Sequence, residues 1–145
     1  LHGYISDITR TYVYGTPSER HRDIWNLEKA AQAAAFNAAQ NGATCASVDT
    51  AARHVIEAAG LGPDYKLPGL PHRTGHGTGL DIHEHPYLVR SDMRPLEKGM
   101  VLSVEPMICV PGEFGIRHED HFYMTENGPK WFTQPMQSID NPFGD

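Results

Sequence analysis

At 145 residues and 16.1 kDa, the chain has the length of a single domain with enough residues to bury a core. Apolar residues make up 39% and charged residues 21%, which is typical of a globular chain and excludes a disordered one. The net charge of −6, without any basic run, argues against nucleic acid as a partner, and no apolar stretch approaches the ~20 residues of a membrane span.

The first third of the chain predicts a strand and two helices. Residues 3–14 (GYISDITRTYVY) are rich in Tyr, Ile, Thr and Val and predict a strand. Ser18 is the expected N-cap of a helix over 19–40, in which apolar and alanine positions recur at helical spacing. Ser47 is the expected cap of a second helix over 48–59, ended by Gly60. We expect both helices to be structural cover, without a polar cluster on either.

The middle of the chain is rich in glycine and histidine. Residues 61–70 contain four Gly or Pro breakers and predict a surface loop. The stretch 72–84 (HRTGHGTGLDIHE) then interleaves His72, His76 and His83 with three glycines. Glycine lets a backbone approach a ligand closely, and neutral imidazole is a common metal ligand and acid–base group. We interpret this stretch as a pocket wall, followed by a loop over 85–99.

The last third predicts a β-hairpin. Residues 100–110 and 116–125 are the expected strands, joined by a turn at 111–115. A second turn at 126–128 leads to a short strand at 130–133, and the tail from Gln134 is expected to fray. The two cysteines, Cys45 and Cys109, form no Cys-x-x-Cys motif. We expect buried thiols in a reducing, cytoplasmic setting, with a disulfide or a thiolate ligand as the alternative.

Three carboxylates lie in segments that otherwise favour burial: Asp7, Glu105 and Glu119. A carboxylate in an apolar strand is costly unless it is paired or bound to a metal. One of them would be unremarkable on a half-exposed sheet, but three of them beside a Gly-His-Gly segment indicate a metal site of Mn, Zn, Co or Fe type. Arg10 and Arg117 lie on the same strands, where each is either solvated or orients a ligating carboxylate.

Four ordered motifs, SDITRT, GHGTGLDIHE, SVEP and GIRHED, resemble the creatinase/aminopeptidase P superfamily. The resemblance covers essentially the whole chain and implies an α+β "pita-bread" fold, a curved antiparallel sheet covered by helices. It implies a catalytic domain over 1–139, incomplete at its N-terminus, and a tail over 140–145. In GIRHED, the arginine two residues before the glutamate resembles the Xaa-Pro aminopeptidase and prolidase branch.

The resemblance implies a metallopeptidase that hydrolyses the bond between an N-terminal residue and proline, in a peptide or a dipeptide. Asp7 and Glu119 would bridge two divalent ions, with manganese expected first and cobalt or zinc as alternatives. His76 and Glu105 would complete the shell of the first ion, and Glu105 would also accept a proton. His72 and His83 would contact the substrate, and Arg117 would steady Asp7 or a neighbouring carboxylate. The neighbouring histidines are expected bystanders: His85, His118 and His121.

Two alternatives stay open: a methionine aminopeptidase, and a non-catalytic pita-bread module that binds peptides or proteins. The family pattern also has a metal-ligating aspartate on the strand before Asp7 and an N-terminal domain, and this chain contains neither. The chain begins at Leu1 without an initiator methionine, so we expect the C-terminal part of a longer, homodimeric protein. These 145 residues alone are expected to bind one metal at best and to be weak or inactive.

Overall fold

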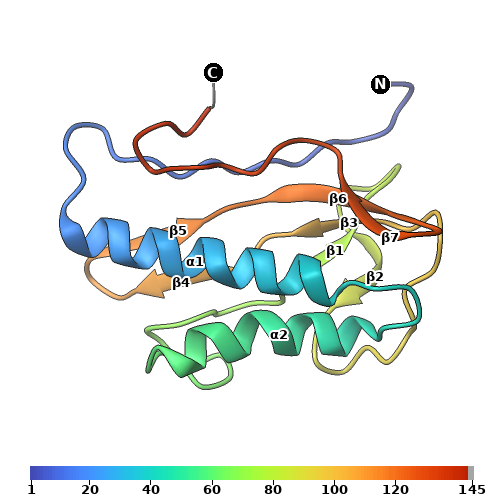
Figure 1. Ribbon diagram of the computed structural model, residues 1–145, viewed down its shortest axis with the longest axis horizontal. Coiled ribbons are helices and arrows are strands. Elements are labelled where there is room, and N and C mark those ends of the chain that lie inside the picture. The colour runs from blue at the N-terminus through green and yellow to red at the C-terminus, as the bar shows by residue number, and fades with distance from the viewer. Residues whose placement is uncertain (144–145) are drawn as a thin grey trace.

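The computed structural model describes residues 1–143 and has the predicted α+β architecture. Helices α1 (Glu19–Ala38) and α2 (Cys45–Ala58) pack against each other and lie along the same side of the strands (Figure 1). The strands are β1 (Gly75–Gly77), β2 (Glu84–Leu88), β3 (Val101–Val104), β4 (Met107–Val110), β5 (Phe114–Arg117), β6 (Asp120–Thr125) and β7 (Gly128–Trp131). Five form one antiparallel sheet in the order β2-β1-β3-β6-β7, and β4 pairs with β5 in a second.

Both helices were predicted, and their N-cap residues explain where the predicted first residue agrees with the structure and where it does not. Helix α1 begins after Ser18 as expected, and the Ser18 hydroxyl accepts a hydrogen bond from the His21 amide at 3.2 Å. Helix α2 begins three residues earlier than predicted, so the expected cap at Ser47 is wrong. Thr44 is the cap because its hydroxyl accepts the Ser47 amide at 3.1 Å, while the Ser47 hydroxyl donates back to the Thr44 carbonyl at 2.7 Å.

The predicted hairpin is present, but each of its long strands is interrupted. One strand breaks at Glu105-Pro106 and the other at His118-Glu119. Val104 pairs with Asp120 in the large sheet, and Met107 pairs with Arg117 in the small one, so the two breaks lie opposite each other. Proline lacks the N–H that would continue a ladder. The hairpin therefore passes from one sheet to the other at the point where Glu105 and Glu119 lie.

The predicted N-terminal strand over 3–14 is wrong as a regular strand. The segment is extended, but within the described part of the chain its only bridge joins Thr9 to Glu119. Beyond that bridge, the Thr11 hydroxyl replaces backbone partners: it donates to the Arg117 carbonyl at 2.7 Å and accepts the Arg117 amide at 3.2 Å. A side chain thus satisfies groups that a continuous ladder would have paired.

The glycine and histidine stretch is more regular than expected, because β1 and β2 lie within the regions predicted as a pocket wall and a loop. The glycines of β1 allow the neighbouring strands to approach closely. A Cβ atom at Gly75 would lie 2.1 Å from the Ser103 carbonyl oxygen, and one at Gly77 would lie 2.7 Å from that of Glu84. Only glycine lets β1 fit between β2 and β3 this closely.

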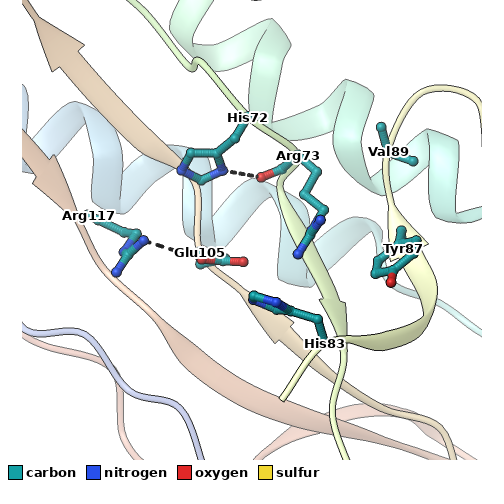
Figure 2. A pocket seen from close by; sticks show the side chains of 7 residues that line it. All are labelled: His72, Arg73, His83, Tyr87, Val89, Glu105 and Arg117. Carbon is teal, nitrogen blue, oxygen red and sulfur yellow. Dashed lines mark hydrogen bonds and ion pairs between the residues drawn. The ribbon is translucent and has the colours of Figure 1, made fainter. Parts of the chain in front are cut away.

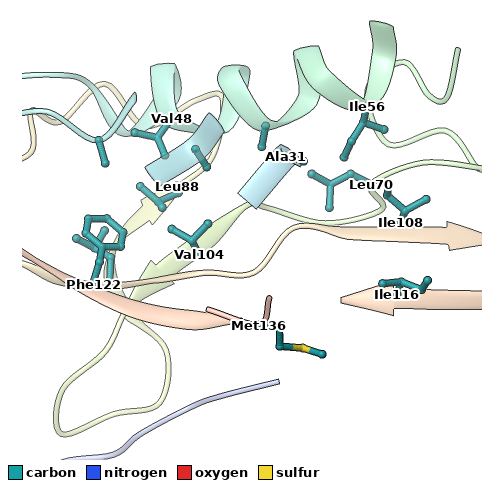
Figure 3. Packing of buried hydrophobic residues seen from close by; sticks show 14 of the residues in the cluster. Ala31, Val48, Ile56, Leu70, Leu88, Val104, Ile108, Ile116, Phe122 and Met136 are labelled. Atoms are coloured by element: carbon teal, nitrogen blue, oxygen red, sulfur yellow. The ribbon is translucent and has the colours of Figure 1, made fainter. Parts of the chain in front are cut away.

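The core lies between the two helices and the sheets, where Val48 of α2 lies over Leu88 and Ile56 lies over Leu70 (Figure 3). The expectation of a fraying tail from Gln134 is wrong as far as residue 139, since Met136 and Ile139 are buried in this core. Of the predicted tail 140–145, the last two residues lie outside the described part of the chain.

The last strand, β7, begins two residues earlier than predicted. Cys45 and Cys109 are free thiols, the first buried and the second half-buried. Within residues 1–143, no helix combines the length and the apolar character needed to cross a membrane.

Candidate metal centre

The two strand breaks and β1 bring three donor residues together. His76 is the central residue of β1, Glu105 follows β3, and Glu119 precedes β6. One nitrogen or oxygen atom from each lies within 4.8 Å of the others, and all three side chains are buried. His76 Nε2 lies 3.2 Å from Glu105 Oε1. His76 Nδ1 donates to the Gly77 carbonyl at 2.9 Å, which leaves Nε2 free as a donor to a metal.

The donor atoms fit a divalent cation. His76 Nε2 and Glu119 Oε1 are buried and have no hydrogen-bond partner among the described residues. Buried polar atoms are rarely left without a partner, so two of them facing a carboxylate call for a ligand. One imidazole and two carboxylates form a nitrogen–oxygen set suited to manganese, cobalt or zinc.

A second group joins Asp7 to His76 and His83, again with donor atoms within 4.8 Å. Asp7 is half-buried and comes from the extended N-terminal segment, whereas His83 is exposed on the loop before β2. Their donor atoms do not share one such group with Glu119. The predicted bridging pair of Asp7 and Glu119 is therefore not drawn together as closely as His76, Glu105 and Glu119 are.

The charges of this cluster act on one another. Burial raises the pKa of Glu119, and the nearby carboxylates of Glu105 and Asp7 raise it further. A hydrogen bond from the Thr9 hydroxyl at 2.6 Å acts in the opposite direction. Burial also acts to raise the pKa of Glu105, but the contact with His76 outweighs it and holds that pKa below its usual value. The negative charge is therefore concentrated beside His76.

Arg10 and Arg117 both contact the segment that carries Glu119. Arg117 lies 3.7 Å from Glu105 and 3.9 Å from Glu119, and its Nε donates to the Thr9 hydroxyl at 3.2 Å. Of the two partners predicted for Arg117, the geometry fits a neighbouring carboxylate rather than Asp7. Arg10 donates to the Glu119 carbonyl at 2.9 Å and pairs with Asp120 at 2.6 Å. Both arginines thus hold the segment that carries Glu119.

A pocket of about 430 Å³ opens beside Glu105 (Figure 2). This is the volume of a small-molecule site. His72 and His83 line it, as does Arg117, together with three residues that the sequence did not single out: Arg73, Tyr87 and Val89. His72 Nδ1 is committed to the Arg73 carbonyl at 2.6 Å, whereas its Nε2 is buried and has no partner among residues 1–143. That nitrogen is therefore available to a bound molecule.

The three expected bystander histidines do not line this pocket. His85 is exposed and contacts Arg94 at 2.7 Å. His118 packs on Trp25 and lies 3.0 Å from Glu28, and burial lowers its pKa to about 3. His121 is buried and lines a separate cavity beside the N-terminal segment.

Both helices carry polar clusters, contrary to expectation. On α2, Asp49 accepts hydrogen bonds from the Thr74 amide and hydroxyl at 3.2 and 2.7 Å, and Arg53 donates to the His72 carbonyl at 2.6 Å. On α1, Gln32 donates to Asp120 at 3.1 Å, and Glu28 contacts His118. The signal in the sequence was the spacing of four residues in each pair, which puts both members on one helix face.

Comparisons with known proteins agree with this geometry. The model of the family described as metallopeptidase family M24 matches residues 1–126. An Xaa-Pro dipeptidase of Lactobacillus helveticus is 44% identical over 94% of this chain and 36% of its own length. The crystal structure of a dipeptidase from Pyrococcus horikoshii superposes with a TM-score of 0.86 at 41% identity, over 94% of this chain and 37% of that one.

A more distant structure shares the architecture. The zinc-substituted aminopeptidase P of E. coli superposes with a TM-score of 0.82 at 26% identity, over 96% of this chain and 37% of that chain. The predicted pita-bread fold is thus confirmed. The chain spans little more than a third of the length of these relatives, so it contains only part of their structure.

Proposed function

This chain belongs to metallopeptidase family M24, and we propose that the protein that carries it is a metal-dependent exopeptidase acting on Xaa-Pro substrates. It hydrolyses the bond between an N-terminal residue and proline. The observation that carries the proposal is the buried cluster of His76, Glu105 and Glu119. Two of its donor atoms have no hydrogen-bond partner among the residues that the structure describes, and the cluster lies at the edge of a pocket of substrate size. Relatives named Xaa-Pro dipeptidase support the choice of substrate.

In this proposal, His76, Glu105 and Glu119 hold a divalent metal ion, and Asp7 belongs to the shell of a second. When bound, such ions act as Lewis acids that polarise a carbonyl and ease the deprotonation of water. Glu105 accepts a proton during hydrolysis. His72 presents Nε2 to the substrate, because its Nδ1 is held by the Arg73 carbonyl, and His83 contacts the substrate from the exposed side. Arg117 orients Glu105 and Glu119.

Manganese is the ion we propose, with cobalt or zinc as alternatives, since the donor set is nitrogen and oxygen only. A cytoplasmic location is part of the proposal, supported by two free thiols, Cys45 and Cys109. So is the homodimer that the resemblance implies.

The test is the release of the first residue from Ala-Pro by the full-length protein loaded with Mn²⁺, measured by chromatography of the free amino acids. We expect turnover of Ala-Pro that EDTA abolishes and added Mn²⁺ restores, with slower cleavage of Met-Ala. A protein that binds Mn²⁺ but releases no residue from any Xaa-Pro substrate would contradict the proposal. Preference for Met-Ala would point to a methionine aminopeptidase instead.

A further inference from the structure

The ligand candidates Glu105 and Glu119 lie at the two breaks of the hairpin, outside the ladders of both sheets. Glu119 is bridged to Thr9 of the N-terminal segment instead. Helix α1 runs beside the hairpin and contacts β3, β4 and β5, the strands that flank the breaks (Figure 1). The positions of both carboxylates therefore depend in part on contacts that come from outside the hairpin, and α1 is placed to supply them.

One buried face of α1 carries Trp25, Glu28 and Gln32 at helical spacing. Glu28 Oε2 lies 3.0 Å from Nδ1 of His118, which is the residue immediately before Glu119. The Trp25 ring packs on the same imidazole, with 4.3 Å between the ring centres. His118 is buried as well, so these two contacts from α1 fix the residue that precedes the ligand candidate.

Gln32 contacts both breaks through a single nitrogen atom. Its Nε2 donates to the Val104 carbonyl at 3.3 Å and to Asp120 Oδ2 at 3.1 Å. Val104 is the residue immediately before Glu105, and Asp120 is the residue immediately after Glu119. The amide therefore links the two ligand-bearing breaks to each other and to α1.

Neither Glu28 nor Gln32 belongs to the metal cluster itself. Within residues 1–143, neither forms a hydrogen bond or an ion pair with a ligand candidate, and neither lines the pocket beside the cluster. Both are almost fully buried, at 0% and 2% exposed. Burying a carboxylate and an amide costs free energy that an apolar side chain of similar size would not. Covering the sheet therefore explains these two residues poorly, whereas holding the backbone beside the ligands explains both.

We propose that Glu28 and Gln32 are positioning residues of the metal centre: from α1, they hold the segments that carry Glu105 and Glu119 and thereby raise the affinity for the metal ion. The proposal rests on the metal centre proposed above. A carboxylate that is free to move must be ordered when the ion binds, and this ordering weakens binding. The loss of either contact should therefore appear as a lower affinity for the metal.

The experiment measures the Kd for Mn²⁺ by titration calorimetry, on the metal-free full-length protein and its variants, at a temperature where circular dichroism shows each to be folded. We expect Glu28→Met and Gln32→Met each to weaken Mn²⁺ binding by about 10-fold, the lower end of the effect of losing an outer contact of a metal site. Glu28→Gln should stay within about 3-fold of the wild type, because its amide can still form a hydrogen bond with His118 Nδ1. This rescue separates the contact with His118 from the negative charge.

Two controls separate positioning from general effects. Gln40→Met makes the same substitution at an exposed residue after α1, whose amide donates to the Asn37 carbonyl, and it should bind Mn²⁺ normally. Ile56→Val removes a methyl group from the core at α2, so it should lower the melting temperature and leave the Mn²⁺ affinity unchanged.

Wild-type affinity in both methionine variants would overturn the proposal, and so would an equal loss of affinity in Ile56→Val, because the effect would then come from stability. Glu28→Gln binding as weakly as Glu28→Met would overturn the role of the contact with His118. Should Glu28→Met fail to fold, Gln32→Met decides the question alone. A wild type that binds no Mn²⁺ would overturn the proposed metal centre as well, so that failure is distinguishable from the failure of this proposal.

Discussion

At the scale of single residues, the candidate metal centre places negative charge where the protein supplies little to balance it. Glu119 is 1% exposed, its Oε1 has no partner in the described chain, and its closest cation, Arg117, lies 3.9 Å away. Burial raises the pKa of Glu119, and the charges of Glu105 and Asp7 raise it further. Such a site is unfavourable when empty and favourable when a cation fills it, so stability and metal binding should respond to the same substitution in opposite directions.

Glu119→Gln tests this opposition. Without metal, in EDTA, we expect the variant to be at least as stable as the wild type, by up to about 1 kcal/mol, because a crowded buried charge is removed and the Gln amide oxygen still accepts the Thr9 hydroxyl. When Mn²⁺ is added well above the expected Kd, at about 1 mM, the wild type should gain several degrees in melting temperature and the variant almost none.

Differential scanning fluorimetry with and without Mn²⁺ measures both effects. Glu126→Gln is the control, since Glu126 is an exposed carboxylate paired with Lys98. Equal stabilisation of wild type and Glu119→Gln by Mn²⁺ would remove Glu119 from the ligand set.

At the scale of elements, the sequence predicted which segments form helices and strands better than it predicted where they end. Alanine-rich periodicity located α1 and α2, and β-branched residues located the hairpin. The interruption at Glu105-Pro106 had a signal in the sequence, Pro106, which was not used. The one at His118-Glu119 was missed because that segment favours a strand throughout, and the change of partner strand is a tertiary effect. The short β1 was missed because Gly-His-Gly has no strand propensity. It forms a strand here because the neighbouring backbones lie too close for a Cβ atom at either glycine.

The candidate site was predictable to the extent that its residues lie in motifs. His76, Glu105 and Glu119 were predicted as ligands from their motifs, and the structure brings their donor atoms together. Arg73 and Tyr87 were missed, since their stacking joins residues of different segments that no periodicity relates. The polar face of α2 was missed as well, although the spacing of Asp49 and Arg53 was visible in the sequence.

Helix α2 is more than cover for the sheet, because its buried pair of Asp49 and Arg53 holds the segment from His72 to Thr74. Both side chains are less than 5% exposed. We expect Asp49→Asn to destabilise the protein by about 2–4 kcal/mol, since it leaves the Arg53 charge buried without its counter-ion. Chemical denaturation followed by circular dichroism measures the loss.

Glu113→Gln is the matched control for Asp49→Asn. Glu113 pairs with Arg20 on the surface, where both partners are about half exposed, and its loss should cost less than about 1 kcal/mol. Should Asp49→Asn prove as mild as Glu113→Gln, α2 would not clamp the segment that carries His72.

At the scale of the whole molecule, the candidate centre is assembled from four segments that are distant in sequence: the N-terminal extended segment, β1, and the two breaks of the hairpin. The N-terminal segment reaches the site through one bridge, Thr9 to Glu119, and through the hydrogen bond of the Ile5 amide to the Gly79 carbonyl at 2.9 Å. Asp7 lies between these two attachments. It therefore enters the site from a segment that is attached to the rest of the fold by separate hydrogen bonds, without a continuous β-ladder.

This arrangement limits how many metal ions these 145 residues can hold. The two donor groups share His76, and because its Nδ1 is bonded to the Gly77 carbonyl, only Nε2 remains to bind one ion. A second ion would have only Asp7 and the exposed His83 as ligands, because His76 is used by the first ion. Two donors are too few to hold an ion firmly. We expect the isolated chain to bind one Mn²⁺, measured by titration calorimetry, and His76→Ala to abolish this binding. His54→Ala, at an exposed histidine of α2, is the control and should bind normally. Two ions bound with similar affinity would mean that Asp7 and Glu119 approach each other more closely in the loaded protein and bridge the ions.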